Sequence, residues 1–135
     1  MGAVERHGSG GAYEEVVGYS RVIRAGDLVV VAGCTASLPD GAIAGIGDPY
    51  MQTVQTIANV ESALGRVGAT LADVIRTRVF LTDVGHFEGF ARGHGEGFGD
   101  VRPVNTTVVV AGLADPRMLV EIEVDAWVPR AAAGA

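Results

Sequence analysis

The chain contains no lysine, so all ten of its basic residues are arginines. Arginine stays protonated and cannot form a Schiff base, which excludes lysine-based covalent catalysis, a pyridoxal phosphate anchor and the Walker lysine. The single cysteine, Cys34, excludes an internal disulfide and argues against a secreted scaffold. No apolar run approaches the ~18–20 residues of a membrane helix, and residues 1–11 lack a signal-peptide core. We therefore expect a cytoplasmic protein that has no membrane partner.

Positive charge is scarce, and the formal net charge is −6. An acidic surface repels phosphate groups, so we do not expect a nucleic-acid partner. The 135 residues are 48% hydrophobic, which suffices for one packed domain. We predict this domain over 16–130, with a flexible N-terminal segment at 1–15 and a tail at 131–135.

The first half of the chain has the pattern of a β-hairpin followed by a helix. Residues 19–24 and the apolar run 28–33 form the two strands around a Gly-Asp turn. Asp48 is a candidate N-cap and is followed by proline, which favours the first helical position. Apolar residues at helical spacing then predict a helix over 49–66.

The second half predicts a strand at 74–81, a helix at about 86–98, and strands at 106–110 and 119–127. The order is β-β-α-β-α-β-β, which indicates an α+β fold with two helices on one face of a mixed sheet. The helix at 86–98 carries glycines four residues apart, at Gly89, Gly93 and Gly97. Such spacing indicates a face that another backbone approaches closely.

The last strand separates two kinds of side chain. Valine, isoleucine and alanine at even positions from 120 to 126 can meet the helices, whereas Glu121, Glu123, Asp125 and Trp127 point the other way. Phe80 and Val109 are expected on the same open face as these carboxylates. A face that mixes apolar groups, carboxylates and arginines is best explained by packing against copies of the chain in a cyclic oligomer.

Several segments together resemble the RidA (YjgF-like) family. The similarity runs from about residue 16 to 129. The segments that carry it are Tyr19-Ser20-Arg21, Ala32-Gly33-Cys34, Arg76-Thr77-Arg78-Val79-Phe80-Leu81-Thr82-Asp83, Arg102-Pro103-Val104-Asn105-Thr106-Thr107-Val108 and Leu119-Val120-Glu121-Ile122-Glu123. The resemblance implies a chorismate-mutase-like fold, a homotrimer, and ligand clefts between neighbouring subunits. It also implies hydrolysis of reactive enamines and imines, such as 2-aminoacrylate, to a keto acid and ammonia without a metal or cofactor.

The resemblance places Glu121 as the catalytic residue, because the equivalent glutamate helps orient or activate the attacking water. The alternative for Glu121 is an ion pair with Arg21 or Arg78 that holds the oligomer together. Tyr19 would form the cleft wall, or would be an interface aromatic. Gly33 and Cys34 would line the cleft through their backbone, without thiol chemistry.

Three positions depart from the family pattern. The arginine that grips the substrate carboxylate is replaced by Asn105, the cleft cysteine by Thr107, and a cleft asparagine by Ala91. A neutral amide cannot replace a bidentate guanidinium–carboxylate contact worth ~1.5–3 kcal/mol. The departure argues against classical 2-iminoacid deaminase activity, unless Arg21, Arg78 or Arg102 supplies the cation. Asn105 and Thr107 remain candidates for shaping the pocket around a small-molecule ligand.

Three functions remain open at this point. The first is a RidA-like hydrolase of enamines, imines or related nitrogen compounds; the second is a non-catalytic ligand-binding trimer or a specialised pathway enzyme. Endoribonuclease activity is disfavoured by the acidic charge. No metal site is expected, because His86 and His94 are eight residues apart rather than four. His94 is predicted to be a core histidine with a hydrogen-bond partner, and Glu123 to pair with an arginine.

Overall fold

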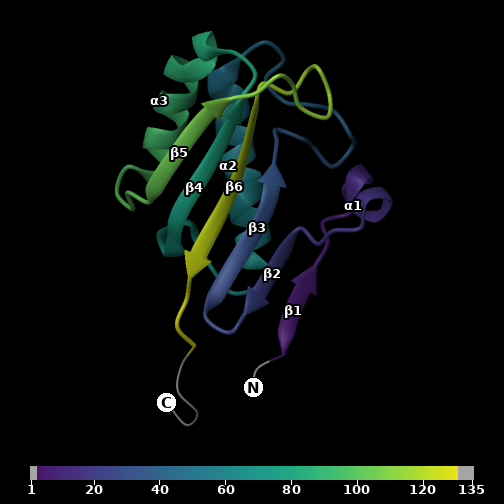
Figure 1. Ribbon diagram of the computed structural model, residues 1–135, viewed down its shortest axis with the longest axis vertical. Helices are drawn as coiled ribbons and strands as arrows, with labels where there is room; N and C mark the ends of the chain where they lie inside the picture. Colours follow the sequence, from purple (N-terminus) through teal and green to yellow (C-terminus); the bar gives the residue numbers. More distant parts are fainter. Residues whose placement is uncertain (1–2, 131–135) are drawn as a thin grey trace.

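The computed structural model describes residues 3–130, and the predicted tail at 131–135 lies outside this range. The described chain forms one six-stranded sheet in the order β1-β2-β3-β6-β4-β5 (Figure 1). Its strands are β1 Val4–His7, β2 Val22–Ala25, β3 Leu28–Cys34, β4 Val74–Leu81, β5 Val104–Val109 and β6 Val120–Trp127. The β4–β5 pair is parallel and the other pairs are antiparallel, so the sheet is mixed, as predicted.

The helices are α1 Ala12–Val17, α2 Pro49–Gly65 and α3 Phe87–Phe98, with short 3₁₀ turns at Leu71–Asp73 and Val84–His86. The two long helices pack against each other and lie behind the sheet in the view of Figure 1. Helix α2 begins where the Asp48 carboxylate accepts a hydrogen bond from the Met51 backbone N–H at 3.1 Å. The expected arrangement, two helices on one face of one mixed sheet, is confirmed.

The first strand and the first helix were not predicted. Both β1 and α1 lie largely in the segment at 1–15 that we expected to be a flexible lead-in. Strand β1 pairs with β2 along its whole length, and these backbone hydrogen bonds do not require an apolar pattern. The structure also starts β2 at Val22 rather than residue 19, and β5 at Val104 rather than 106.

The core lies between the sheet and helices α2 and α3. The inward side of β6 is fully buried, as its alternation predicted: Val120, Ile122, Val124 and Ala126 are at most 1% exposed. Neighbouring strands and the helices complete the core with Val22, Val29, Val31, Leu64, Val79, Leu81 and Phe98. The opposite side of β6 is therefore the side that water or another chain can reach.

The glycine face of α3 packs against α2, as the four-residue spacing predicted. A Cβ on Gly93 would lie 2.9 Å from Thr53 Cγ2, one on Gly89 would lie 3.1 Å from the Tyr50 backbone nitrogen, and one on Gly97 would lie 3.1 Å from Ile57 Cδ1. The missing side chains thus allow the two helices to approach closely.

The placement of Val109 on the open face was wrong. In the parallel β4–β5 pair, Val109 is level with the buried Leu81 and shares its side of the sheet. Val108 is level with Phe80 instead, and is the β5 valine on the open face. The error arose because the register between β4 and β5 decides which face each β5 side chain occupies, and a difference of one residue in that register exchanges the two faces.

Candidate functional site

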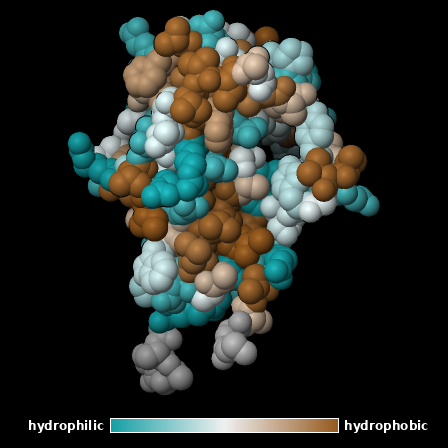
Figure 2. Space-filling model, in the orientation of Figure 1, coloured by the Kyte–Doolittle hydropathy of each residue, from teal (hydrophilic) through white to brown (hydrophobic). Residues whose placement is uncertain are grey.

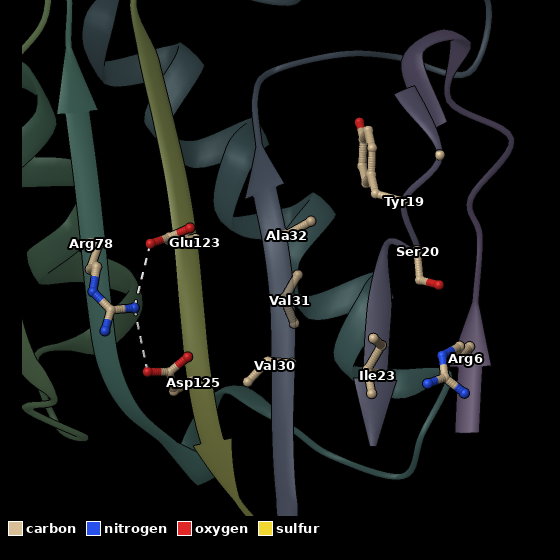
Figure 3. Close-up of a pocket in the computed structure, with 11 residues that line it drawn as sticks. Arg6, Tyr19, Ser20, Ile23, Val30, Val31, Ala32, Arg78, Glu123 and Asp125 are labelled. Carbon is tan, nitrogen blue, oxygen red and sulfur yellow. Dashed lines mark hydrogen bonds and ion pairs between the residues drawn. The ribbon is translucent and has the colours of Figure 1, made fainter. Parts of the chain in front are cut away.

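The open face carries a row of carboxylates on β6 beside cations on β4. The Arg78 guanidinium on β4 lies 3.4 Å from Glu123 and 3.5 Å from Asp125 (Figure 3). Its Nη1 donates a hydrogen bond to Glu123 Oε1, which confirms the predicted pairing of Glu123 with an arginine. These two carboxylates therefore share a single arginine, which offsets one of their two negative charges.

Glu121, the third carboxylate of the row, is different. It lies opposite Phe80 on β4, and no hydrogen bond or ion pair among residues 3–130 involves its carboxylate. Neither of the ion pairs that we considered as its structural role, with Arg21 or Arg78, is formed. Burial raises the pKa of the Glu121 carboxyl, Arg21 opposes this, and the charge of Glu123 adds to it. A carboxylate with these properties can accept a proton from a bound water.

Gly33 provides the space in which the Glu121 side chain lies. The β3–β6 register shifts between Val31 and Cys34, so β3 has a bulge next to β6. A Cβ on Gly33 would lie 2.8 Å from Glu121 Cδ and 3.1 Å from its Cγ. The structure thus brings two of the predicted site residues into direct contact, and a glycine is required for it.

Arg21 connects the bulge to Tyr19. Its Nη1 donates hydrogen bonds to the Gly33 carbonyl at 2.6 Å and the Ala32 carbonyl at 3.3 Å. Its Nη2 donates to the Tyr19 hydroxyl at 3.0 Å, and its guanidinium lies 5.3 Å from the Tyr19 ring centre. Tyr19 therefore joins Gly33 and Glu121 at one end of the open face. Sequence reasoning treated Arg21 only as a possible ion-pair partner or substrate cation.

Cys34 belongs to the helix side of the sheet. It is level with Ile122, is 5% exposed, and its thiol lies 3.4 Å from the Ala32 carbonyl oxygen. Burial raises the pKa of the Cys34 thiol, although Arg21 opposes the shift. A thiol that stays protonated is a poor nucleophile, in keeping with the expectation that Cys34 has no thiol chemistry.

Asn105 and Thr107 lie on the opposite side of the sheet from Glu121. Asn105 is level with Thr77 and donates to its hydroxyl at 2.9 Å; the Thr107 hydroxyl donates to Asn105 at 2.9 Å. Thr77 also shares a 2.9 Å hydrogen bond with His94 Nε2 of α3, so His94 has the predicted partner, although its side chain is only half-buried. Within one chain, therefore, the structure does not bring Asn105 and Thr107 together with Glu121. Ala91 is exposed on α3.

The open face also contains a hollow of about 480 Å³. Figure 3 shows Tyr19, Ala32, Ile23 and Arg6 along it, with Glu123 and Asp125 on the β6 side. Tyr19 is the predicted site residue that lines it. Figure 2 shows apolar residues gathered near the top and over the centre of this face, with hydrophilic residues between these areas.

Within residues 3–130, no group of three or more His, Cys, Asp or Glu side chains is placed to hold a metal ion. None of the helices in this described part of the chain is long and apolar enough to span a bilayer.

A mixed sheet with two helices packed on one face defines an α+β domain, and the open face of this one carries the carboxylate row of β6. The family is shown by a protein-family model described as Endoribonuclease L-PSP, which matches residues 11–128. The chain belongs to this family, which is the YjgF/RutC/RidA family that the sequence motifs resembled.

Known relatives and solved structures agree with this assignment. Streptomyces coelicolor SCO2049 is 43% identical over 93% of the chain and 92% of that protein. The RutC family protein PYRAB12510 of Pyrococcus abyssi is 32% identical over 81% of the chain and 85% of that protein. The crystal structure of Rv2704 from Mycobacterium tuberculosis, a member of the YjgF/YER057c/UK114 family, superposes with a TM-score of 0.84 at 44% identity. That match covers 93% of this chain and 100% of the other, and confirms the chorismate-mutase-like fold.

Proposed function

We propose that the protein is a small-molecule hydrolase that acts on enamines, imines or related nitrogen compounds, with Glu121 orienting and deprotonating the attacking water. One observation carries the proposal: the Glu121 carboxylate is partly buried, has a raised pKa, and has no partner among the described residues. A buried carboxylate without a structural partner is costly to stability, so such groups are concentrated at functional sites. The resemblance implies that the reaction needs no metal or cofactor.

We further propose that the working form is a homotrimer with its ligand sites between subunits. The exposed edge strand β5 supports this, since Val104 is 60% exposed and Val108 is 43% exposed. Trp127, at the end of β6, is 50% exposed on the open face. Asn105 and Thr107 lie across the sheet from Glu121 of their own chain. They can therefore share a ligand site only with the Glu121 of a neighbouring subunit. A trimer would place β5 of one chain against the open face of the next.

The favoured substrate is one without a carboxylate. Asn105 is neutral, and its amide nitrogen already donates to Thr77. Arg78 lies between Glu123 and Asp125, and Arg21 is bonded to Gly33, Tyr19 and Glu14. Arg21 lacks two parallel N–H groups for a substrate carboxylate, and Arg78, which is bonded through Nη1, stands beside two carboxylates that would repel another one.

The test compares Glu121→Gln with Glu123→Gln as a matched control on the same strand. Imines are generated in situ by oxidases from neutral amines and from amino acids, and ammonia release is followed. We expect Glu121→Gln to lower kcat by about 10²–10⁴-fold, as for loss of a general base, and Glu123→Gln to leave most activity. Equal activity in wild type and Glu121→Gln would overturn the assignment. EDTA-treated protein should keep its activity.

A non-catalytic ligand-binding trimer is the second candidate, favoured by the inward hydrogen bond of Asn105. Saturable binding of an imine analogue without turnover by wild type would establish it. In that case Asn105→Arg should confer hydrolysis of 2-aminoacrylate if the scaffold is competent and only its anchor is missing. If wild type already hydrolyses 2-aminoacrylate, another arginine binds the carboxylate.

We do not propose endoribonuclease activity, although the family description names it. The net charge of −6 and the row of carboxylates on the open face oppose binding of a polyanion. RNA cleavage that co-purifies with the protein through a further chromatographic step would contradict this view.

We also propose a cytoplasmic location. Fluorescence microscopy of the tagged protein in its host cell would test it.

A further inference from the structure

Arg21 occupies a central position between the N-terminal segment and the candidate site. On one side its Nε donates to Glu14 of α1 at 3.2 Å. On the other side its two terminal nitrogens donate to the Gly33 carbonyl and the Tyr19 hydroxyl. The Arg21 side chain is 13% exposed and the Glu14 side chain 9% exposed, so both charges are largely removed from water.

Glu14 is itself held firmly. It accepts a hydrogen bond from the Ser9 backbone N–H at 2.8 Å and another from the Ser9 hydroxyl. Since these bonds stabilise its charged form, they lower the pKa of the Glu14 carboxyl, although burial opposes them. The negative charge that faces Arg21 is therefore permanent at neutral pH.

We propose that Arg21 is a positioning residue, divided between Glu14 of α1 and the β3 bulge, that fixes the backbone beneath Glu121 and sets the charge of that carboxylate. The inference rests on the proposed function only for the role of Glu121. The structural argument is that one guanidinium bonds Gly33, the residue on which the Glu121 side chain lies, as well as Tyr19 at the edge of the hollow. Removing it would free both contacts at once.

The hydrogen-bond inventory of Arg21 explains why it positions rather than binds substrate. A guanidinium has five N–H groups. One donates to Glu14, the pair on Nη1 faces the Ala32 and Gly33 carbonyls and the Cys34 sulfur, and one on Nη2 donates to Tyr19. A single N–H remains, which cannot form a bidentate contact with a carboxylate.

The charges around Glu121 predict how its pKa should change when each neighbouring charge is removed. Arg21, the residue before β2, stabilises the charged form of Glu121, and Glu123 on the same strand as Glu121 destabilises it. Opposite it on β4 lies the uncharged Phe80, and the titratable groups bonded to Arg21 are Tyr19, Cys34 and Glu14. Loss of the Arg21 charge should therefore raise the pKa of Glu121. Neutralising Glu14 should instead leave the positive charge of Arg21 uncompensated. Arg21 would then attract the Glu121 carboxylate more strongly and lower the pKa of Glu121.

The test is an NMR titration of the full-length protein with ¹³C-labelled glutamate, in which Glu121→Gln assigns the Glu121 resonance. We expect Arg21→Gln to raise the pKa of Glu121 by about half a pH unit or more, and Glu14→Gln to shift it in the opposite direction. Arg21→Lys, which keeps the charge, should restore a value near that of wild type. Arg92→Gln is the matched control, since Arg92 lies on α3 over Tyr50, outside the site.

Opposite shifts in the two variants support the proposal, because general disruption of the site would move both the same way. Shifts of the same sign, or no shift in either variant, overturn it. If Arg21→Gln fails to fold, the direction of the Glu14→Gln shift decides alone. The titration needs no substrate, so a protein that hydrolyses no imine would refute the proposed function while leaving this result interpretable.

Discussion

The Glu121 carboxylate lies against the backbone of Gly33, in space that any other residue would fill with its Cβ. The contact joins the bulge of β3 to the open side of β6, the two strands at the centre of the sheet. The position of Glu121 on β6 therefore requires a glycine at position 33 of β3.

Gly33→Ala should displace the Glu121 side chain, because the new Cβ would lie 2.8 Å from its Cδ. We expect ligand binding or turnover to fall at least tenfold, while the free energy of unfolding changes by about 1 kcal/mol or less, since a flexible side chain can move aside. A crystal structure of the variant and chemical denaturation measure the two effects. Gly112→Ala is the control, since nothing lies within 4 Å of a Cβ there. An unmoved Glu121 in the Gly33→Ala structure would contradict the prediction.

Gly93→Ala should destabilise the fold by about 1–3 kcal/mol, because its Cβ would overlap Thr53 where α2 and α3 meet. Gly95→Ala, two residues along the same helix, meets nothing within 4 Å and should stabilise it by up to about 1 kcal/mol. Urea denaturation of both variants measures the difference. Equal effects would show that the interhelical contact is looser than the structure indicates.

His94 should make stability depend on pH. Burial between Phe90 and Phe98 lowers the pKa of the His94 imidazole below its ordinary value of 6.5. As pH falls through about 6.5, the unfolded chain takes up the proton first, so the free energy of unfolding decreases. The decrease ends once the folded protein is protonated as well. Denaturation between pH 8 and 5 should show this slope in wild type.

The His94→Gln variant should lack that part of the slope, whereas His86→Gln, altered outside the Phe90–Phe98 stack, should keep it. An identical pH dependence in wild type and His94→Gln would rule out the contribution of this histidine.

Cys34 should be unreactive in the folded protein. Its thiol is 5% exposed and burial raises its pKa, so the thiolate fraction at pH 7.5 is small. We expect iodoacetamide to modify it at least 100-fold more slowly than in urea-unfolded protein, as followed by mass spectrometry. Cys34→Ala should retain ligand binding. Rapid alkylation without unfolding would show that the thiol faces the site.

Strong periodicity was enough to predict the main elements. The alternation from 120 to 127 predicted β6 and both of its faces, and Asp48 with Pro49 predicted the start of α2. These signals are local, because the side-chain period and the cap depend on a few neighbouring residues. Strand β1 carried no such signal, since its partner is β2 and its polar residues lie at an edge of the sheet.

The alternation in β6, the glycines of α3 and the family motifs could all be read from the amino-acid sequence, since each is a property of a short segment. The folded arrangement of residues 3–130 was needed to show that Glu121 lacks an ion-pair partner among them, while Arg78 pairs with Glu123 and Arg21 with Glu14. It also decided that Asn105 and Thr107 lie across the sheet from Glu121, because a register of strands far apart in the chain sets which face each side chain occupies. Ion pairs and the face that a side chain occupies depend on contacts between segments far apart in the chain. A local pattern therefore cannot predict which of several arginines will lie nearest to a given carboxylate.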